Sequence, residues 1–156
     1  MSYDEVQALK NELTSVKEKN NHLFQQNVLP KKEEKKQEFL DVFEEFFREK
    51  GFVVQKKTDS VRASFDTLNF KAFFNENGEL IIMNGRDPIA SILIRFNGEK
   101  HSITNFNESV IQLKKELENE NILSIKLENP MFYYTGANSD IRFDSPLSVL
   151  NSIFQL

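Results

Sequence analysis

A heptad pattern in the first thirty residues constrains the fold more than any other feature of the sequence. With Val6 placed at heptad position a, side chains suited to a helical seam recur at alternating spacings of three and four. Such a stripe is too narrow to form one wall of a globular core, and it is typical of a coiled coil. The predicted seam, which we also predict to be a dimerisation surface, consists of Val6, Leu9, Leu13, Val16, Asn20 and Leu23.

The charges beside this seam predict the direction and number of its strands. Glu5 and Glu12 occupy position g, and Lys10 and Lys17 occupy position e. In a parallel pair each g residue meets the e residue five places further along its partner, so both contacts are attractive. Asn20 at position a is the type of polar residue that fixes register and favours two strands. We therefore predict a parallel two-stranded coiled coil between two chains, either a homodimer or a heterodimer. The alternative is a single amphipathic helix that lies back on its own domain.

A proline sets the expected boundary of the coil. Pro30 disfavours helix at Leu29, so the coil is expected to kink or stop there. The Lys/Glu run at 31–36 then restarts a helix with a solvated first turn. The sequence thus predicts a coiled-coil segment at residues 1–30 and a globular α+β domain at residues 31–156.

The first part of this domain has the pattern of a helix followed by an antiparallel sheet. A wide apolar face at 38–50 predicts a helix that packs on a sheet and ends at Gly51. Short apolar runs follow, separated by turn signals at 75–78, 84–85 and 97–98, which predicts an antiparallel meander that ends near Ile103. The apolar face of the helix consists of Phe39, Leu40, Val42, Phe43, Phe46 and Phe47.

The last fifty residues predict two further helices and one or two strands. Thr104 or Asn107 is a suitable cap for a helix that carries Val110 and ends near Asn121. Residues 122–127 are expected to form a further strand or an extended segment, and residues 131–134 a strand. A short helix that starts at Ser145 or Pro146 is expected to close the chain at Phe154.

Composition excludes several classes of function. The chain has 156 residues and a net charge of −4, and no segment has the positive excess needed to neutralise phosphates, so direct nucleic-acid binding is not expected. It has no cysteine, which excludes disulfides and thiolate metal sites. No apolar run approaches 18 residues and the start lacks a basic leader, so neither a membrane span nor a secretory signal is expected. The expected location is the nucleus or the cytoplasm.

No group of residues has the spacing of a catalytic, cofactor or metal site. His22 and His101 fall on different elements. Glu116, Glu118 and Glu120 lie two apart, which spreads them over different faces of a helix. The five glycines occur singly, so no phosphate-binding loop is present, and nothing resembles a nucleophile elbow. We therefore expect no enzymatic activity, no cofactor and no metal.

Two aromatic features are candidate partner-binding residues. Phe24 lies at position e, on the edge of the predicted seam, where a domain or a partner can contact it. Phe132, Tyr133 and Tyr134 are consecutive, and alternation along a strand directs at least one of them away from the core. Tyrosine is favoured at interfaces because it combines apolar area with a polar tip. The alternative is that the C-terminal helix covers all three.

The order of these elements resembles the RWD-type domains of kinetochore proteins. The resemblance is carried by Phe43–Val54, where helix, Gly51 and first strand join, by Asp87–Thr104, and by the closing segment Ser145–Asn151. Such domains end dimeric coiled coils in outer-kinetochore subunits, the coiled-coil subunit of monopolin and the mitotic checkpoint scaffold. The resemblance implies a nuclear scaffold that docks chromosome-segregation partners through its globular domain.

Three functional hypotheses follow from the sequence. The first is a non-enzymatic dimeric adaptor that presents two α+β domains for protein binding, with a role in kinetochore assembly or chromosome segregation. The second is a small accessory protein of phage or plasmid type that inhibits a host factor through its acidic surface. The third is an enzyme with an active site on the sheet, and no residue pattern in the sequence supports it. A deep pocket that holds His101 beside an acidic side chain would favour this hypothesis.

Overall fold

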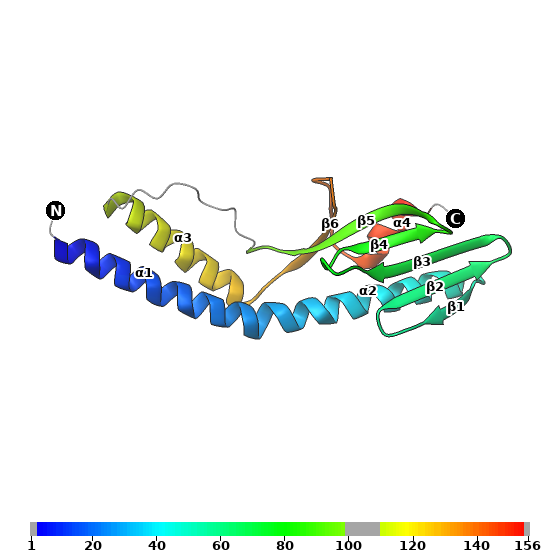
Figure 1. Cartoon of the computed structure of the whole chain (residues 1–156), viewed down its shortest axis with the longest axis horizontal. Coiled ribbons are helices and arrows are strands. Elements are labelled where there is room, and N and C mark those ends of the chain that lie inside the picture. Colours follow the sequence, from blue (N-terminus) through cyan, green and yellow to red (C-terminus); the bar gives the residue numbers. More distant parts are fainter. Residues whose placement is uncertain (1–2, 99–109, 155–156) are drawn as a thin grey trace. The chain divides into compact units, whose positions relative to one another are not determined.

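The computed structural model of the chain describes residues 3–98 and 110–154, which form an α+β protein (Figure 1). Its residues divide into two compact units. The first unit contains Met1–Lys31 and Phe96–Met131, and the second contains Lys32–Arg95 and Phe132–Leu156. The α+β class with a long N-terminal helix is confirmed. The division differs from a boundary at residue 30 because a later segment of the chain joins the N-terminal helix.

The N-terminal helix does not stop at Leu29, where the sequence predicted either a kink or a stop. Helix α1 (Tyr3–Leu23) passes into a π-helical turn η1 (Phe24–Val28), and helix α2 (Leu29–Glu49) follows directly. Leu29 donates its backbone N–H to the carbonyl of Phe24, five residues back. Proline lacks an N–H, and its ring crowds the carbonyl four residues back in an α-helix. The wider π turn just before Pro30 gives this ring room, so the helix continues.

The second unit contains an antiparallel sheet whose seven strands lie side by side in chain order. The predicted meander is therefore confirmed, and so is the strand predicted at residues 131–134. Strand β7 at the C-terminal edge was not predicted, and the last short strand of the meander, predicted to end near Ile103, lies outside the described residues. Gly78 and Gly85 have positive φ in two of the predicted turns. The strands are β1 (Val53–Lys56), β2 (Ser60–Phe65), β3 (Leu68–Phe74), β4 (Leu80–Asn84), β5 (Asp87–Phe96), β6 (Phe132–Gly136) and β7 (Arg142–Phe143).

Helices α2 and α4 (Pro146–Ile153) cover one face of this sheet. Phe47 lies at the centre of the core, with ring centroids of Phe52 and Phe154 at 4.9 and 5.0 Å. Gly51 ends α2 with φ of +85°, as predicted. Ser145 caps α4 by accepting a hydrogen bond from the N–H of Ser148, which confirms the short closing helix. Each helix therefore packs on the sheet through one apolar stripe.

The first unit pairs α1 with helix α3 (Val110–Glu128). The prediction that this helix ends near Asn121 is wrong, and residues 122–127 are helical instead of extended. Leu113, Glu120, Ser124 and Leu127 are buried along its length. Burial at a spacing of three and four continues past Asn121, and this packing outweighs the β-branched residues nearby. Residues 99–109, which include His101 and the predicted caps Thr104 and Asn107, lie outside the described part of the chain.

Candidate functional site

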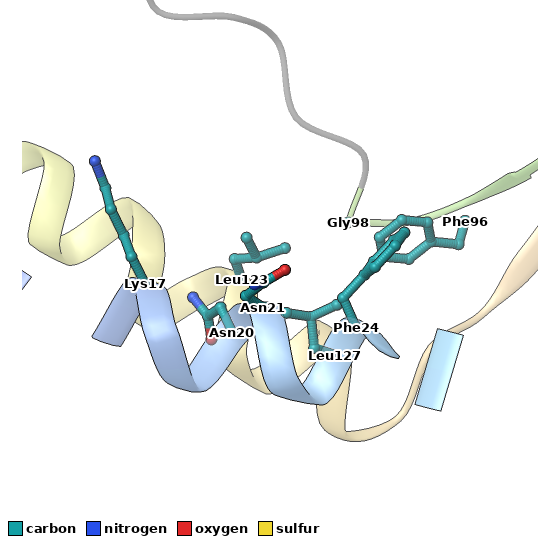
Figure 2. A pocket seen from close by; sticks show the side chains of 8 residues that line it. All are labelled: Lys17, Asn20, Asn21, Phe24, Phe96, Gly98, Leu123 and Leu127. Atoms are coloured by element: carbon teal, nitrogen blue, oxygen red, sulfur yellow. The ribbon is translucent and has the colours of Figure 1, made fainter. Parts of the chain in front are cut away.

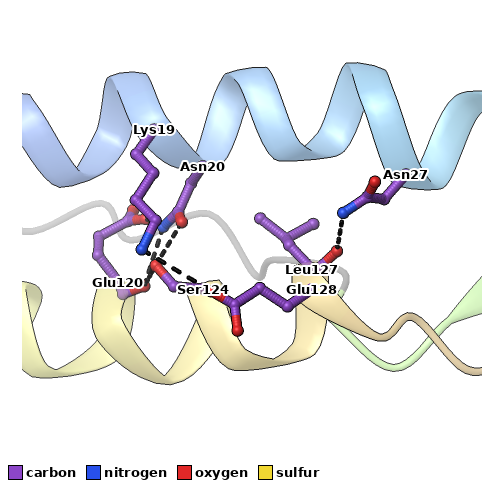
Figure 3. Close-up of polar contacts among 7 residues, drawn as sticks. All are labelled: Lys19, Asn20, Asn27, Glu120, Ser124, Leu127 and Glu128. Carbon is purple, nitrogen blue, oxygen red and sulfur yellow. Dashed lines mark hydrogen bonds and ion pairs between the residues drawn. The ribbon is translucent and has the colours of Figure 1, made fainter.

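The predicted seam of α1 faces α3 of the same chain, and the two helices run parallel (Figure 3). Asn20 contacts Glu120 and Ser124, and Asn27 contacts Leu127, so residue numbers rise together along both helices. Asn20 and Ser124 are 104 residues apart in sequence. The same offset places every predicted seam residue of α1 opposite a heptad core position of α3. The two helices therefore form an in-register parallel coil within one chain.

A buried polar layer holds this register. Asn20 is only 3% exposed, and its amide nitrogen donates to the carbonyl oxygen of Glu120 at 2.9 Å and to the Glu120 carboxylate at 2.8 Å. Ser124 donates from its hydroxyl to the amide oxygen of Asn20. Each polar group of the Asn20 side chain thus has a partner, which a one-heptad shift of either helix would remove. The sequence predicts that Asn20 fixes register between two chains, whereas these hydrogen bonds hold α1 in register with α3 of the same chain.

An ion pair at the edge of the coil follows the same parallel geometry. Lys19 lies at position g of α1, and its Nζ is 3.8 Å from a carboxylate oxygen of Glu128. With the offset of 104, Glu128 occupies the e position that a g residue meets in a parallel pair. Both side chains are more than half exposed, so the ion pair contributes little stability. Its main effect is to favour the parallel orientation of the two helices. The stripe thus has a partner within its own chain, and pairing between two copies stays a prediction.

A pocket of about 450 Å³ lies beside the polar layer in the first unit (Figure 2). Phe24 and Phe96 form one wall, with ring centroids 5.9 Å apart. Gly98 permits this packing, since a Cβ there would lie 2.6 Å from the Phe96 ring. Phe24, which the sequence placed at the edge of the seam, therefore contacts its own chain. The lining consists of Lys17, Asn20, Asn21, Phe24, Phe96, Gly98, Leu123 and Leu127.

The three consecutive aromatic residues of β6 separate as alternation requires. Tyr134 is 2% exposed in the core of the second unit, which removes it from any exposed partner-binding surface. Phe132 packs against the same core. Tyr133 points to the opposite face, where the guanidinium carbon of Arg142 lies 4.1 Å from its ring centroid. Of these three consecutive aromatic residues, Tyr133 is the one directed away from the core.

The buried phenol of Tyr134 is not hydrogen bonded in the described part of the chain. Burial raises the pKa of this phenol from 10.0 to about 12, and the charge of Glu38 acts in the same direction. A buried hydroxyl without a partner costs stability. Tyr134 therefore belongs to the core and is not at its energetic optimum there.

The face of the sheet opposite α2 and α4 carries apolar side chains that are only half buried. Phe73 on β3 is the register partner of Ile81 on β4, and Ile81 is the partner of Ser91 on β5. No described helix of the second unit packs on this face. We call it the open sheet face and define it by Arg62, Lys71, Phe73, Ile81, Met83 and Leu93.

Sequence reasoning missed the open sheet face, although a signal was present. Phe73 and Phe74 are consecutive, and so are Ile81, Ile82 and Met83. Because successive side chains of a strand point to opposite faces, consecutive apolar residues put apolar groups on both faces of the sheet. An antiparallel sheet with one solvated face normally alternates apolar and polar residues.

Two positive charges lie directly opposite each other on the open sheet face. Arg62 on β2 is the register partner of Lys71 on β3. The ammonium of Lys71 lies 5.2 Å from the ring centroid of Phe73 on the same face. Among residues 3–98 and 110–154, neither cation forms an ion pair with a carboxylate. Like charges at directly opposed positions of a sheet are destabilising.

The exposed side of α2 forms an acidic groove of about 510 Å³. Its charge is partly neutralised, because Lys36 pairs with Glu33 at 3.0 Å and Lys56 pairs with Asp41. An acidic surface is the feature through which the second hypothesis, an accessory protein that inhibits a host factor, would act, and this groove is such a surface. Its lining consists of Glu33, Glu34, Gln37, Glu38, Asp41, Val42 and Glu45.

The potential metal ligands of the described residues do not cluster. Within them, no three histidine, aspartate or glutamate side chains gather to hold a metal ion. His22 is exposed on α1. Glu118 is exposed and Glu120 is buried, so these carboxylates do lie on different faces of the helix, as predicted. None of the described helices has both the length and the apolar character needed to cross a bilayer.

Comparison with known proteins gives no relative. No family model, curated protein or solved structure matches this chain. The resemblance to RWD-type kinetochore proteins therefore stays a prediction, and function is inferred from the surfaces described above.

Proposed function

We propose that this chain is a non-enzymatic adaptor that binds a partner protein through the open sheet face. The carrying observation is the pair of Phe73 and its register partner Ile81, with Leu93 two residues beyond the Ser91 position on β5, on a face that no described helix of its unit covers. Contiguous apolar area at a protein surface is typical of interaction sites. The kinetochore context that the RWD resemblance implies belongs to this proposal as its cellular setting.

The proposal places the partner on the sheet and not on the seam of α1. A two-stranded coil has one partner for each seam, and α3 occupies that place through the Asn20 layer. A homodimer through α1 would require α3 to leave. We therefore expect a monomer at micromolar concentration in light scattering. If the protein is instead a dimer that Leu13→Asp converts to a monomer, the coiled coil between two chains that the sequence predicts would be supported.

Site-specific photo-crosslinking in the native cell tests the binding face. A photoreactive amino acid at Ile81 should give discrete protein adducts, whereas the same group at Leu147 should not. Leu147 is a matched control because it is an exposed apolar residue of α4 in the same unit. Adducts of equal yield from both positions, or none from Ile81, would contradict the proposal.

The acidic groove supports a second candidate function, inhibition of a host factor by a phage- or plasmid-type accessory protein. The observation in its favour is the number of carboxylates that α2 presents around one groove, namely those of Glu33, Glu34, Glu38, Asp41 and Glu45. Charge of one sign on such a surface steers a basic partner. If Glu34→Lys with Glu45→Lys abolishes partner capture while Ile81→Asp does not, this second function replaces the first.

A further inference from the structure

The opposed cations of the open sheet face carry an inference about the chemistry of the partner. Arg62 and Lys71 lie side by side on neighbouring strands, and neither has an acidic partner within the described ranges. The chain as a whole has a net charge of −4, so these cations are not part of a general positive excess. A carboxylate from outside the chain would relieve their repulsion.

Apolar residues lie in the adjacent row of the same face. The register places Lys71 opposite Met83, and Phe73, two residues further along β3, opposite Ile81. Successive same-face residues of a strand are about 7 Å apart, so cations and apolar groups form one continuous surface. A matching partner must therefore present carboxylates directly beside an apolar stripe.

We propose that the occupant of the open sheet face is an acidic amphipathic helix of a partner protein, an inference that depends on the adaptor function proposed above. A helix is the element that covers a sheet face through an apolar stripe, as α2 does on the other side of this sheet. Carboxylates flanking that stripe complement Arg62 and Lys71 and determine which helices are accepted.

Two other occupants fit the surface less well. Single-stranded nucleic acid needs neighbouring aromatic platforms on which successive bases stack, and here Ile81, Met83 and Leu93 lie between Phe73 on β3 and Tyr133 on β6. A second copy would have to offer its acidic groove, where Val42 is the single apolar residue and is itself partly buried in the core. That groove has charge but no apolar stripe to cover Ile81.

Two matched peptides test the charge requirement. Both are 18-residue helices with the same leucine and alanine stripe, flanked by glutamate in one and by lysine in the other. Each is titrated into the isotope-labelled full chain, and amide shifts of Ile81 and Leu93 are followed by NMR. The glutamate peptide should bind about ten-fold more tightly than the lysine peptide, since ion pairs at a partly covered surface are of this order. Its affinity should fall as salt is raised.

A charge-reversal variant supplies the decisive control. Arg62→Glu with Lys71→Glu should exchange the preference of the two peptides, with the circular dichroism spectrum unchanged. Lys114→Glu with Lys126→Glu makes the same charge change on exposed positions of α3 and should leave the preference as it is.

Each other outcome overturns the inference. Equal affinity for the two peptides would remove the charge requirement while the crosslinks from Ile81 still support the adaptor function. No binding of either peptide at this face would remove the helix as occupant. Shifts at Ile81 with a thymidine oligonucleotide would assign the face to nucleic acid, and concentration-dependent shifts of the chain alone would assign it to a second copy.

Discussion

Removal of the Asn20 side chain is the sharpest perturbation of the first unit. Asn20→Ala deletes two hydrogen bonds from the amide nitrogen to Glu120 and one from Ser124 to the amide oxygen. A neutral hydrogen bond contributes about 1 kcal/mol net, and one to a charged group about 1.5–3 kcal/mol. The variant also leaves the buried Glu120 carboxylate without that donor. We expect the free energy of unfolding to fall by about 3–5 kcal/mol.

The assay is urea denaturation of the full chain, followed by helical circular dichroism. Asn21→Ala is the matched control, because Asn21 is the same residue type one position along and is exposed. Its unfolding free energy should change by no more than about 0.5 kcal/mol. If Asn20→Ala costs less than about 1 kcal/mol, the polar layer does not hold the coil together.

A combined variant distinguishes two costs of Asn20→Ala: the lost hydrogen bonds themselves, and the buried polar groups that the substitution leaves without a partner. Asn20→Ala together with Glu120→Ala and Ser124→Ala removes the Asn20 amide, the Glu120 carboxylate that accepts from it and the Ser124 hydroxyl that donates to it. Replacing all members of a buried network can be nearly neutral, whereas removing one member is costly. We therefore expect the triple variant to be more stable than Asn20→Ala alone. A triple variant whose loss equals the sum of the three single losses would refute this explanation.

Three further predictions concern the packing of each unit. Leu13→Asp puts a charge into the α1–α3 seam, where Leu13 is buried, and should reduce helical circular dichroism while the sheet signal of the second unit persists. Tyr134→Phe should raise the unfolding free energy by about 1 kcal/mol, because it deletes the unpartnered hydroxyl. It should also abolish a pH effect: with the phenol pKa raised to about 12 in the fold, the unfolded chain ionises first, so wild-type stability should fall as pH rises from 10.0 to about 12 relative to the variant. Gly98→Ala should cost about 1–3 kcal/mol in a thermal melt, since the new Cβ meets the Phe96 ring at 2.6 Å and Leu123 at 3.0 Å.

The heptad of α1 was predictable from sequence, but its partner was not. The seam residues, the parallel direction and the role of Asn20 all follow from spacing and charge. The matching stripe of α3 is hidden because two of its core positions are polar, Glu120 and Ser124. At the same time Ile122 and Ile125 are exposed on the opposite side, so the apolar residues of that helix do not mark its buried face.

For the sheet as well, the sequence predicts the local elements but not their tertiary packing. Turn residues and apolar runs predict the meander and its chain order, because hairpin chemistry is local. The open sheet face depends on which side the helices cover, and this is a property of tertiary packing. Likewise the π turn before Pro30 arises from a conflict between proline geometry and continued helix packing, which no local preference resolves.

The parallel pairing of α1 with α3 has a consequence for synthesis of the chain. Asn20 and Ser124 are 104 residues apart, so the ribosome must add strands β1 to β5 and most of α3 before α1 can pair with α3. At a translation rate of about 5–20 residues per second, α1 leaves the ribosome on the order of 5–20 s before α3 does. The leucine side chains of its seam are exposed to solvent during that time. During that interval, neighbouring nascent chains on one messenger RNA expose the same apolar stripe to each other and can pair through it. A holdase chaperone that binds this stripe would favour folding of each chain as a monomer over pairing between chains.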